Sequence, residues 1–197
     1  MAAVCVYCAS STSIDPQLVA LAAEVGAELA RRGHTLVSGG GRVSMMGAVA
    51  AAARAGGART LGVIPEALSS REIADFDSDE LVVTAGMRER KAAMDDRADA
   101  FLGLPGGIGT LEEMFEVWTS RSLGMHAKPV VLLNVGGFYD GLLHWLSDLS
   151  GRGFVRAEAL ALLTVVDSVP AAFAAVEDGI ASASRIEAGP AAPVRRS

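Results

Sequence analysis

The chain has 197 residues, of which 51% are hydrophobic and only 5% aromatic, with a formal net charge of −6. This length fits a single domain whose core is built mainly from Ala, Val, Leu and Ile. No basic stripe is present, which argues against a nucleic-acid partner, and no apolar run is long enough to cross a membrane.

The first residues, Met1–Val6, have the pattern of a strand and lack the charged region and cleavage site of a signal peptide. We therefore expect a cytoplasmic protein. Cys5 and Cys8 form a C-x-x-C pair inside this strand, but redox pairs favour a helix N-terminus and a zinc site needs further ligands. We expect both cysteines to be small buried side chains, and we expect no metal site.

Apolar strands alternate with helical segments along the chain. Strands are predicted at Ala3–Cys8, Thr35–Ser38, Thr60–Ile64, Leu81–Thr84, Ala100–Leu104, Val130–Asn134 and Leu163–Val166. Helices are predicted at Pro16–Arg32, Met45–Ala55, Met87–Arg97, Thr110–Leu123, Tyr139–Leu149 and Pro170–Ser182, the first with Asp15 as its N-cap and Gly33 as its stop. The alternation predicts right-handed βαβ units, and so an α/β fold with a mainly parallel sheet covered on both faces.

The chain shows no internal repeat and no domain boundary, so we expect one domain over residues 1–185. The segment Pro65–Glu80 is a polar excursion that could be a solvated loop or a flap over a binding site. It carries the acidic residues Glu72, Asp75, Asp77 and Asp79, among others. Residues 186–197, rich in Ala and Pro, are predicted to be a disordered tail.

A glycine-rich motif from Leu104 to Glu113 follows an apolar strand and opens a helix. Its glycines let the backbone approach a ligand closely, and the free N–H groups of the new helix with the Thr110 hydroxyl favour an anion such as phosphate. The motif is neither a Walker loop nor a dinucleotide fingerprint, since the first strand–helix turn, Ala9–Ser13, contains no glycine. The alternative is a tight turn without a ligand.

The helix that follows this motif has two faces. Its apolar stripe, expected to pack on the sheet, is Leu111, Met114, Phe115 and Trp118. Glu112, Glu113 and Glu116 fall on the opposite side, which is typical of a solvated face. Glu113 nevertheless lies close to the glycine loop, where a carboxylate could bind ribose hydroxyls, orient a water or stabilise positive charge at the anomeric carbon.

Two further segments could reach the same site. Met87, Met94 and either Arg90 or Lys91 share one helical stripe, so the cation either extends along a helix edge to solvent or points into the site. The segment Ser38–Gly47, with a glycine triplet between a strand and a helix, could form a second wall of the cleft.

Together these motifs resemble the Lonely Guy family, cytokinin riboside 5′-monophosphate phosphoribohydrolases that are often mislabelled as lysine decarboxylases. The family pattern P-G-G-x-G-T-x-x-E is matched at every fixed position by Pro105–Glu113, and its M-x-x-R-K pattern by Met87, Arg90 and Lys91. The glycine triplet Gly39–Gly41 is similar to the first loop of the family.

The resemblance implies a Rossmann-like, doubly wound domain that forms homodimers, with the site near the subunit interface. It implies that Arg90 and Glu113 are the catalytic pair. The residues that it implies in nucleotide binding are Glu72, Lys91, Gly107, Ile108, Gly109, Thr110, Leu111, Glu112 and Thr119.

The implied reaction is hydrolysis of the N-glycosidic bond of an adenosine 5′-monophosphate, N6-modified or not, to give the free base and ribose 5-phosphate, without a cofactor. The alternatives are a non-catalytic nucleotide carrier and a broad purine-nucleotide nucleosidase that acts on AMP. A pyridoxal-phosphate decarboxylase would need a Schiff-base lysine, and the chain has only Lys91 and Lys128.

Overall fold

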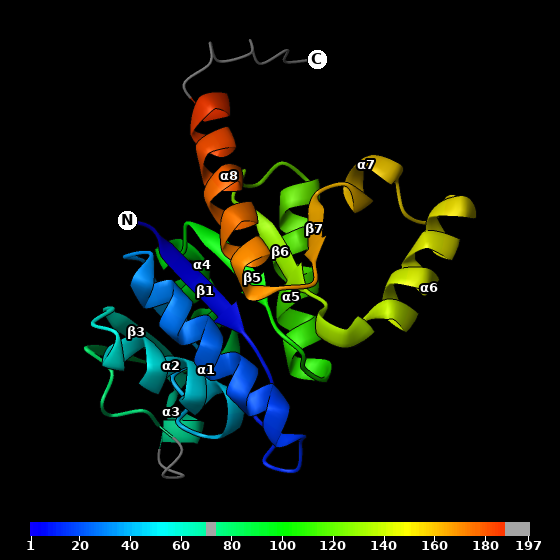
Figure 1. Cartoon of the computed structure of the whole chain (residues 1–197). Helices are drawn as coiled ribbons and strands as arrows, with labels where there is room; N and C mark the ends of the chain where they lie inside the picture. Colours follow the sequence, from blue (N-terminus) through cyan, green and yellow to red (C-terminus); the bar gives the residue numbers. More distant parts are fainter. Residues whose placement is uncertain (70–73, 188–197) are drawn as a thin grey trace.

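The computed structural model describes residues 1–69 and 74–187 (Figure 1). Its strands form one seven-stranded sheet in the order β4-β3-β2-β1-β5-β6-β7, and every neighbouring pair is parallel. The strands are β1 (Ala3–Tyr7), β2 (Thr35–Ser38), β3 (Thr60–Pro65), β4 (Glu80–Thr84), β5 (Ala100–Gly103), β6 (Val130–Leu133) and β7 (Leu163–Val166). The predicted α/β fold is thereby confirmed.

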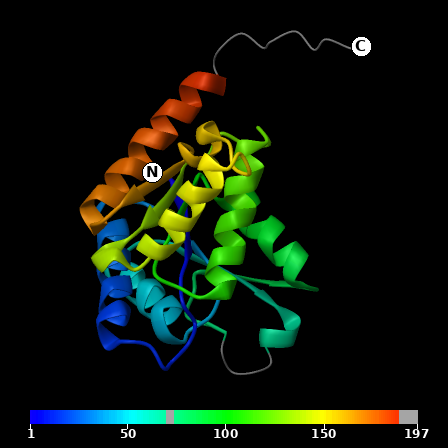
Figure 2. The ribbon, with the colours of Figure 1, turned by 90° about the vertical axis from the view of Figure 1, so that its right-hand side faces the viewer.

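Helices cover both faces of the sheet, as Figure 2 shows from the side. They are α1 (Pro16–Arg31), α2 (Ser44–Ala55), α3 (Glu66–Leu68), α4 (Met87–Arg97), α5 (Ile108–Ser122), α6 (Asp140–Gly151), α7 (Ala157–Leu160) and α8 (Val169–Glu187), with a 3-10 turn, η2 (Val135–Gly137), before α6. Alternate strand residues face opposite layers. Val4 and Val6 pack with α1, α2 and α8, whereas Cys5 and Tyr7 pack with α4 and α5.

Most predicted elements lie within one or two residues of the observed ones. The Asp15 carboxylate caps α1 by accepting a hydrogen bond from the Gln17 N–H at 2.8 Å, and Cys5 and Cys8 are buried, free thiols, as expected. The short helices α3 and α7 were not predicted. Helix α8 continues to Glu187, past residue 186 where the tail was expected to begin, and the rest of that tail lies outside the described residues. The single-domain division at residue 185 stays a prediction.

The segment Pro65–Glu80, for which a solvated loop and a flap were both open, is not solvated at Asp75. This side chain is buried, and it accepts hydrogen bonds from both terminal nitrogens of Arg54, at 2.7 and 3.2 Å. The Asp75 N–H donates to the Gly40 carbonyl at 2.8 Å. A buried charge is tolerated only when it is paired, so this contact anchors the end of the excursion against the first glycine loop.

The order of the strands determines where a ligand can bind. The chain builds β1 to β4 in one direction and then returns to place β5 on the other side of β1. Parallel α/β sheets bind ligands beyond the carboxyl ends of the strands at such a switch point. The loops that follow β1 and β5 flank this point. In the part of the chain that the structure describes, no helix is both long and apolar enough to cross a membrane.

Candidate functional site

A cleft of about 320 Å³, open to solvent, lies beyond the carboxyl ends of β1, β2, β3 and β5. Its position matches the switch point of the sheet. The residues that line it are Cys8, Ala9, Ser10, Ser11, Gly39, Gly41, Met46, Ile64, Leu68, Met87, Arg90, Gly107, Ile108, Gly109, Thr110 and Glu113. Both glycine-rich segments singled out in the sequence therefore contribute to one cleft.

Arg90 of α4 and Glu113 of α5 meet in this cleft. Nη1 of Arg90 donates to Oε1 of Glu113 at 2.5 Å, and the two side chains are 8% and 12% exposed. The helical pattern left open whether Arg90 or Lys91 points inward, the resemblance implied Arg90, and the structure places Arg90 there. Glu113, expected from helical angles on a solvated face, is the buried member of the acidic face of α5. A charge-assisted bond shielded from water is stronger than an exposed one.

The Arg90 guanidinium is held from two more sides. Its Nε donates to the Val63 carbonyl of β3 at 3.0 Å. Its Nη2 lies directly against Gly39, where a Cβ would overlap it. The glycine at position 39 therefore provides the space that the guanidinium occupies beside Glu113.

Burial raises the pKa of Glu113 above its ordinary range, and the charge of Arg90 opposes that rise only in part. A raised pKa means that the carboxylate is lost at a higher pH than in an exposed glutamate. If Glu113 acts as a carboxylate, activity should fall as pH decreases through this raised value.

We therefore expect the acid limb of the kcat/KM profile, which reports the free enzyme, to have its midpoint above ~4.3, the ordinary value for glutamate. A pH profile of base release measures this midpoint. A midpoint at or below the ordinary value would contradict the assignment of Glu113 as the essential carboxylate.

The N-terminus of α5, about one turn before Glu113, lines the same cleft. Gly107 is its N-cap and supplies no capping side chain, so the N–H groups of Ile108, Gly109 and Thr110 have no helical partners. The Thr110 side chain is buried and packs into the space that a Cβ at Gly106 would need. Free N–H groups at the positive end of a helix dipole are a binding site for an anion.

Other predicted nucleotide contacts lie elsewhere. The Lys91 ammonium is bound to Glu112 and to Glu116, the latter at 2.7 Å, so Lys91 and Glu112 link α4 and α5 beside the cleft rather than lining it. Thr119 lines a separate groove farther along α5. Glu72 lies outside the described residues.

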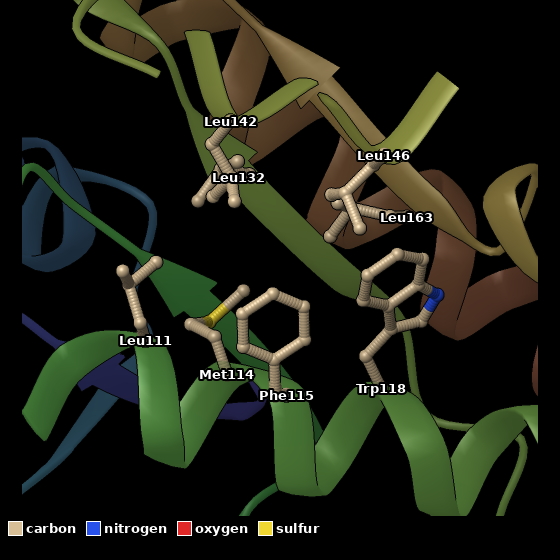
Figure 3. Close-up of a pocket in the computed structure, with 8 residues that line it drawn as sticks. All are labelled: Leu111, Met114, Phe115, Trp118, Leu132, Leu142, Leu146 and Leu163. Carbon is tan, nitrogen blue, oxygen red and sulfur yellow. The ribbon is translucent and has the colours of Figure 1, made fainter. Parts of the chain in front are cut away.

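The apolar stripe of α5 faces away from the cleft. Its four predicted members point toward β6, β7 and α6 and line a narrow apolar pocket of about 20 Å³ (Figure 3). Leu111, predicted to contact the nucleotide, is one of them. The side chains across the pocket are Leu132, Leu142, Leu146 and Leu163.

Some lining residues were not singled out from the sequence. Ser10 and Ser11 follow β1, and Leu68 belongs to the short helix α3. The two serines could have been found, because they directly follow the carboxyl end of a predicted strand. Leu68 could not, since a three-residue helix leaves no periodic pattern. In the described part of the chain, no cluster of three His, Cys, Asp or Glu side chains is arranged to hold a metal ion.

Comparison with known proteins agrees with this geometry. A sequence model of the family described as "Possible lysine decarboxylase" matches residues 46–176. A cytokinin riboside 5′-monophosphate phosphoribohydrolase of Mycobacterium marinum is 54% identical over 89% of this chain and 94% of its own. The protein of that name from Mycobacterium tuberculosis is 56% identical over 84% and 88% of the two chains. The chain belongs to the Lonely Guy family.

The fold of this Lonely Guy protein is shared more widely. The molybdenum cofactor carrier protein of Chlamydomonas reinhardtii superposes with a TM-score of 0.69 at 22% sequence identity, covering 91% of this chain and 98% of the other. At this identity the likeness shows the Rossmann-like fold alone.

The lysine decarboxylase description does not fit the lysines of this Lonely Guy protein. A Schiff-base lysine needs a lowered pKa, whereas hydrogen bonds to Glu112 and Glu116 raise the pKa of Lys91. Lys128 donates to the Asp95 carbonyl at 2.6 Å, and neither lysine lines the cleft.

Proposed function

We propose that the protein hydrolyses the N-glycosidic bond of an adenosine 5′-monophosphate, N6-modified or unmodified, to release the free base and ribose 5-phosphate. The observation that carries the proposal is the Arg90–Glu113 pair, largely shielded from solvent, in the same cleft as the N-terminus of α5. The names of its relatives from two mycobacteria support the same reaction.

In this proposal the 5′-phosphate binds the N–H groups at the start of α5, and the ribose lies over Glu113. Arg90 bonds Oε1 of Glu113, while Oε2 has no bonding partner among the described residues. Oε2 is therefore available to a ribose hydroxyl or to the attacking water.

As the C–N bond breaks, its electron pair leaves with the base and positive charge develops on the ribose, where the carboxylate stabilises it. Water supplies the hydroxyl of the ribose 5-phosphate product and the proton of the released base. Arg90 keeps Glu113 ionised and oriented in this step. No metal or cofactor is part of the proposed reaction.

The experiment that tests the function is chromatographic detection of free base from AMP and from N6-isopentenyl-AMP, with the corresponding nucleosides and GMP as controls. Release from the nucleotides but not the nucleosides supports a hydrolase anchored through the phosphate. The ratio between the two adenylates then separates a cytokinin-specific enzyme from a broad purine-nucleotide nucleosidase. Measurable AMP binding without base release from any compound would instead indicate a nucleotide carrier.

We also propose that two copies of the chain associate through the outer face of α5. Next to the apolar pocket of Figure 3 lies a groove of about 300 Å³ whose lining includes Phe115, Trp118, Thr119, Leu146 and Phe154. Phe154 is 72% exposed. Trp118 and Leu146 beside it are buried, so a second copy at this groove would remove the exposed Phe154 ring from water. A second copy at this face would also bring Thr119 near a subunit boundary, which accounts for its implied role in nucleotide binding.

Phe154→Glu is expected to convert the dimer to a monomer, because it places a charge in an apolar interface. The measurement is light scattering after size-exclusion chromatography. Phe76, equally exposed at 72% but in the β3–β4 segment, provides the control variant Phe76→Glu. A wild-type protein that is monomeric, or a Phe154→Glu variant that stays dimeric, would contradict this interface. The cytoplasmic location expected from the sequence stays a prediction.

A further inference from the structure

One buried tyrosine beneath the glycine-rich loop has no part in the mechanism above. Tyr139, between η2 and α6, is 3% exposed, and its hydroxyl donates to the Leu104 carbonyl at 2.8 Å. Tyr139 thus bonds a peptide group directly before Pro105, at the start of the glycine-rich loop that leads to the N-cap of α5.

The hydroxyl is a proton donor throughout the neutral pH range. Burial raises the pKa of Tyr139 to about 12. Leu104 is fully buried, so its carbonyl has no access to water. A buried carbonyl without a partner is costly, and the tyrosine hydroxyl is the group that satisfies this one.

Tyr139 is itself held firmly in place. Its N–H donates to Oδ1 of Asn134 at 2.6 Å, and Nδ2 of Asn134 donates to Oδ1 of Asp140 at 2.8 Å. Gly137, with φ of 72°, lies against the Asp140 carboxylate, where a Cβ would not fit. The backbone around the tyrosine is therefore fixed by its own turn.

The same loop is supported from its other side. The Thr110 side chain fills the space next to Gly106, and the Leu104 N–H donates to the Tyr7 carbonyl of β1 at 2.9 Å. Tyr139 lies in the connection between β6 and α6, which is outside the cleft. From there its hydroxyl donates a hydrogen bond to the glycine-rich loop. We propose that Tyr139 is a positioning residue for phosphate binding, whose hydroxyl orients the Leu104–Gly107 peptide groups so that the N–H groups at the start of α5 converge on the 5′-phosphate.

This inference rests on the proposed function, and it predicts a selective defect. In Tyr139→Phe the buried Leu104 carbonyl loses its donor, so the loop relaxes. Loss of one hydrogen bond of this kind corresponds to roughly a tenfold change in an equilibrium constant. We expect the KM for AMP and the inhibition constant of ribose 5-phosphate to rise together by roughly tenfold, with kcat and the inhibition constant of adenine nearly unchanged.

The experiment measures competitive inhibition of base release by ribose 5-phosphate and by adenine, and calorimetric binding of ribose 5-phosphate in the absence of turnover. The matched control is Tyr7→Phe, which changes the only other tyrosine of the chain. Tyr7 is also 3% exposed, but its hydroxyl bonds Oδ1 of Asp95 at 3.2 Å. The Tyr7→Phe control should lower the melting temperature without weakening the binding of ribose 5-phosphate.

Tyr139→Phe with wild-type affinity for ribose 5-phosphate, in an enzyme whose wild type binds that compound, overturns the positioning role alone. Equally weakened binding of adenine and of ribose 5-phosphate also overturns the positioning role, since loss of a merely structural tyrosine would affect the binding of both compounds. A wild type that does not bind ribose 5-phosphate overturns the proposed function as well. If Tyr139→Phe does not fold, Asn134→Ala decides the matter. The Asn134→Ala substitution removes the hydrogen bond that holds the Tyr139 backbone, so it should weaken the binding of ribose 5-phosphate but not that of adenine. An unchanged affinity for ribose 5-phosphate would reject the proposal.

Discussion

Glu113→Gln is expected to lower kcat by ~10²–10³-fold while the protein still binds AMP. The amide keeps the shape of the side chain and can still accept the Arg90 hydrogen bond through its oxygen. It cannot supply the negative charge that stabilises the ribose in the transition state. Steady-state kinetics of base release give the change in kcat, and calorimetry gives AMP affinity.

Glu116→Gln is the matched control for this variant. Glu116 is one helical turn further along α5, is 45% exposed, and bonds Lys91 rather than Arg90. Neutralising it should leave kcat within about threefold of wild type, because exposed ion pairs contribute little. A Glu113→Gln enzyme that turns over as fast as this control would remove Glu113 from the catalytic pair.

Gly39→Ala is expected to reduce kcat by ~10²-fold with little loss of stability. The added methyl group would overlap Nη2 of Arg90, which is the end of a flexible side chain. The fold can therefore accommodate alanine by displacing the guanidinium, and this displacement separates Arg90 from Glu113. The readouts are kcat, KM for AMP and the melting temperature.

Gly151→Ala serves as the control here, since nothing lies within 4 Å of a Cβ at the end of α6. It should leave both activity and stability near wild type. If Gly39→Ala instead unfolds the protein, or leaves kcat unchanged, Gly39 does not provide the space that positions the Arg90 guanidinium beside Glu113.

Features that depend on neighbouring residues could be predicted from the sequence. The strand–helix alternation predicted the parallel sheet, and the run Pro105–Glu113 predicted a glycine-rich turn that opens α5. Hydrophobic period and turn residues act locally, so their signal is present in the chain itself. The helical angle of Glu113 alone indicated a solvated face, and its position next to the glycine loop was the signal that placed it near the site.

Features that depend on distant contacts could not be predicted. The choice between Arg90 and Lys91 is decided by Val63 and Gly39 on one side and by Glu116 on the other. None of these is adjacent in sequence to the two cations. The burial of Asp75 likewise depends on Arg54 of α2, and no pattern within a polar segment reveals a partner on another helix.

The described lining of the cleft contains one cation, Arg90, and Glu113 already balances its charge. A phosphate at the start of α5 would thus be held by neutral peptide dipoles rather than by a positively charged side chain. Ionic strength screens separated charges in solvent far more than short bonds to fixed dipoles. A site of this kind recognises its anion by the direction of its hydrogen bonds, so its affinity should be largely insensitive to salt, even though both the substrate and the protein are negatively charged.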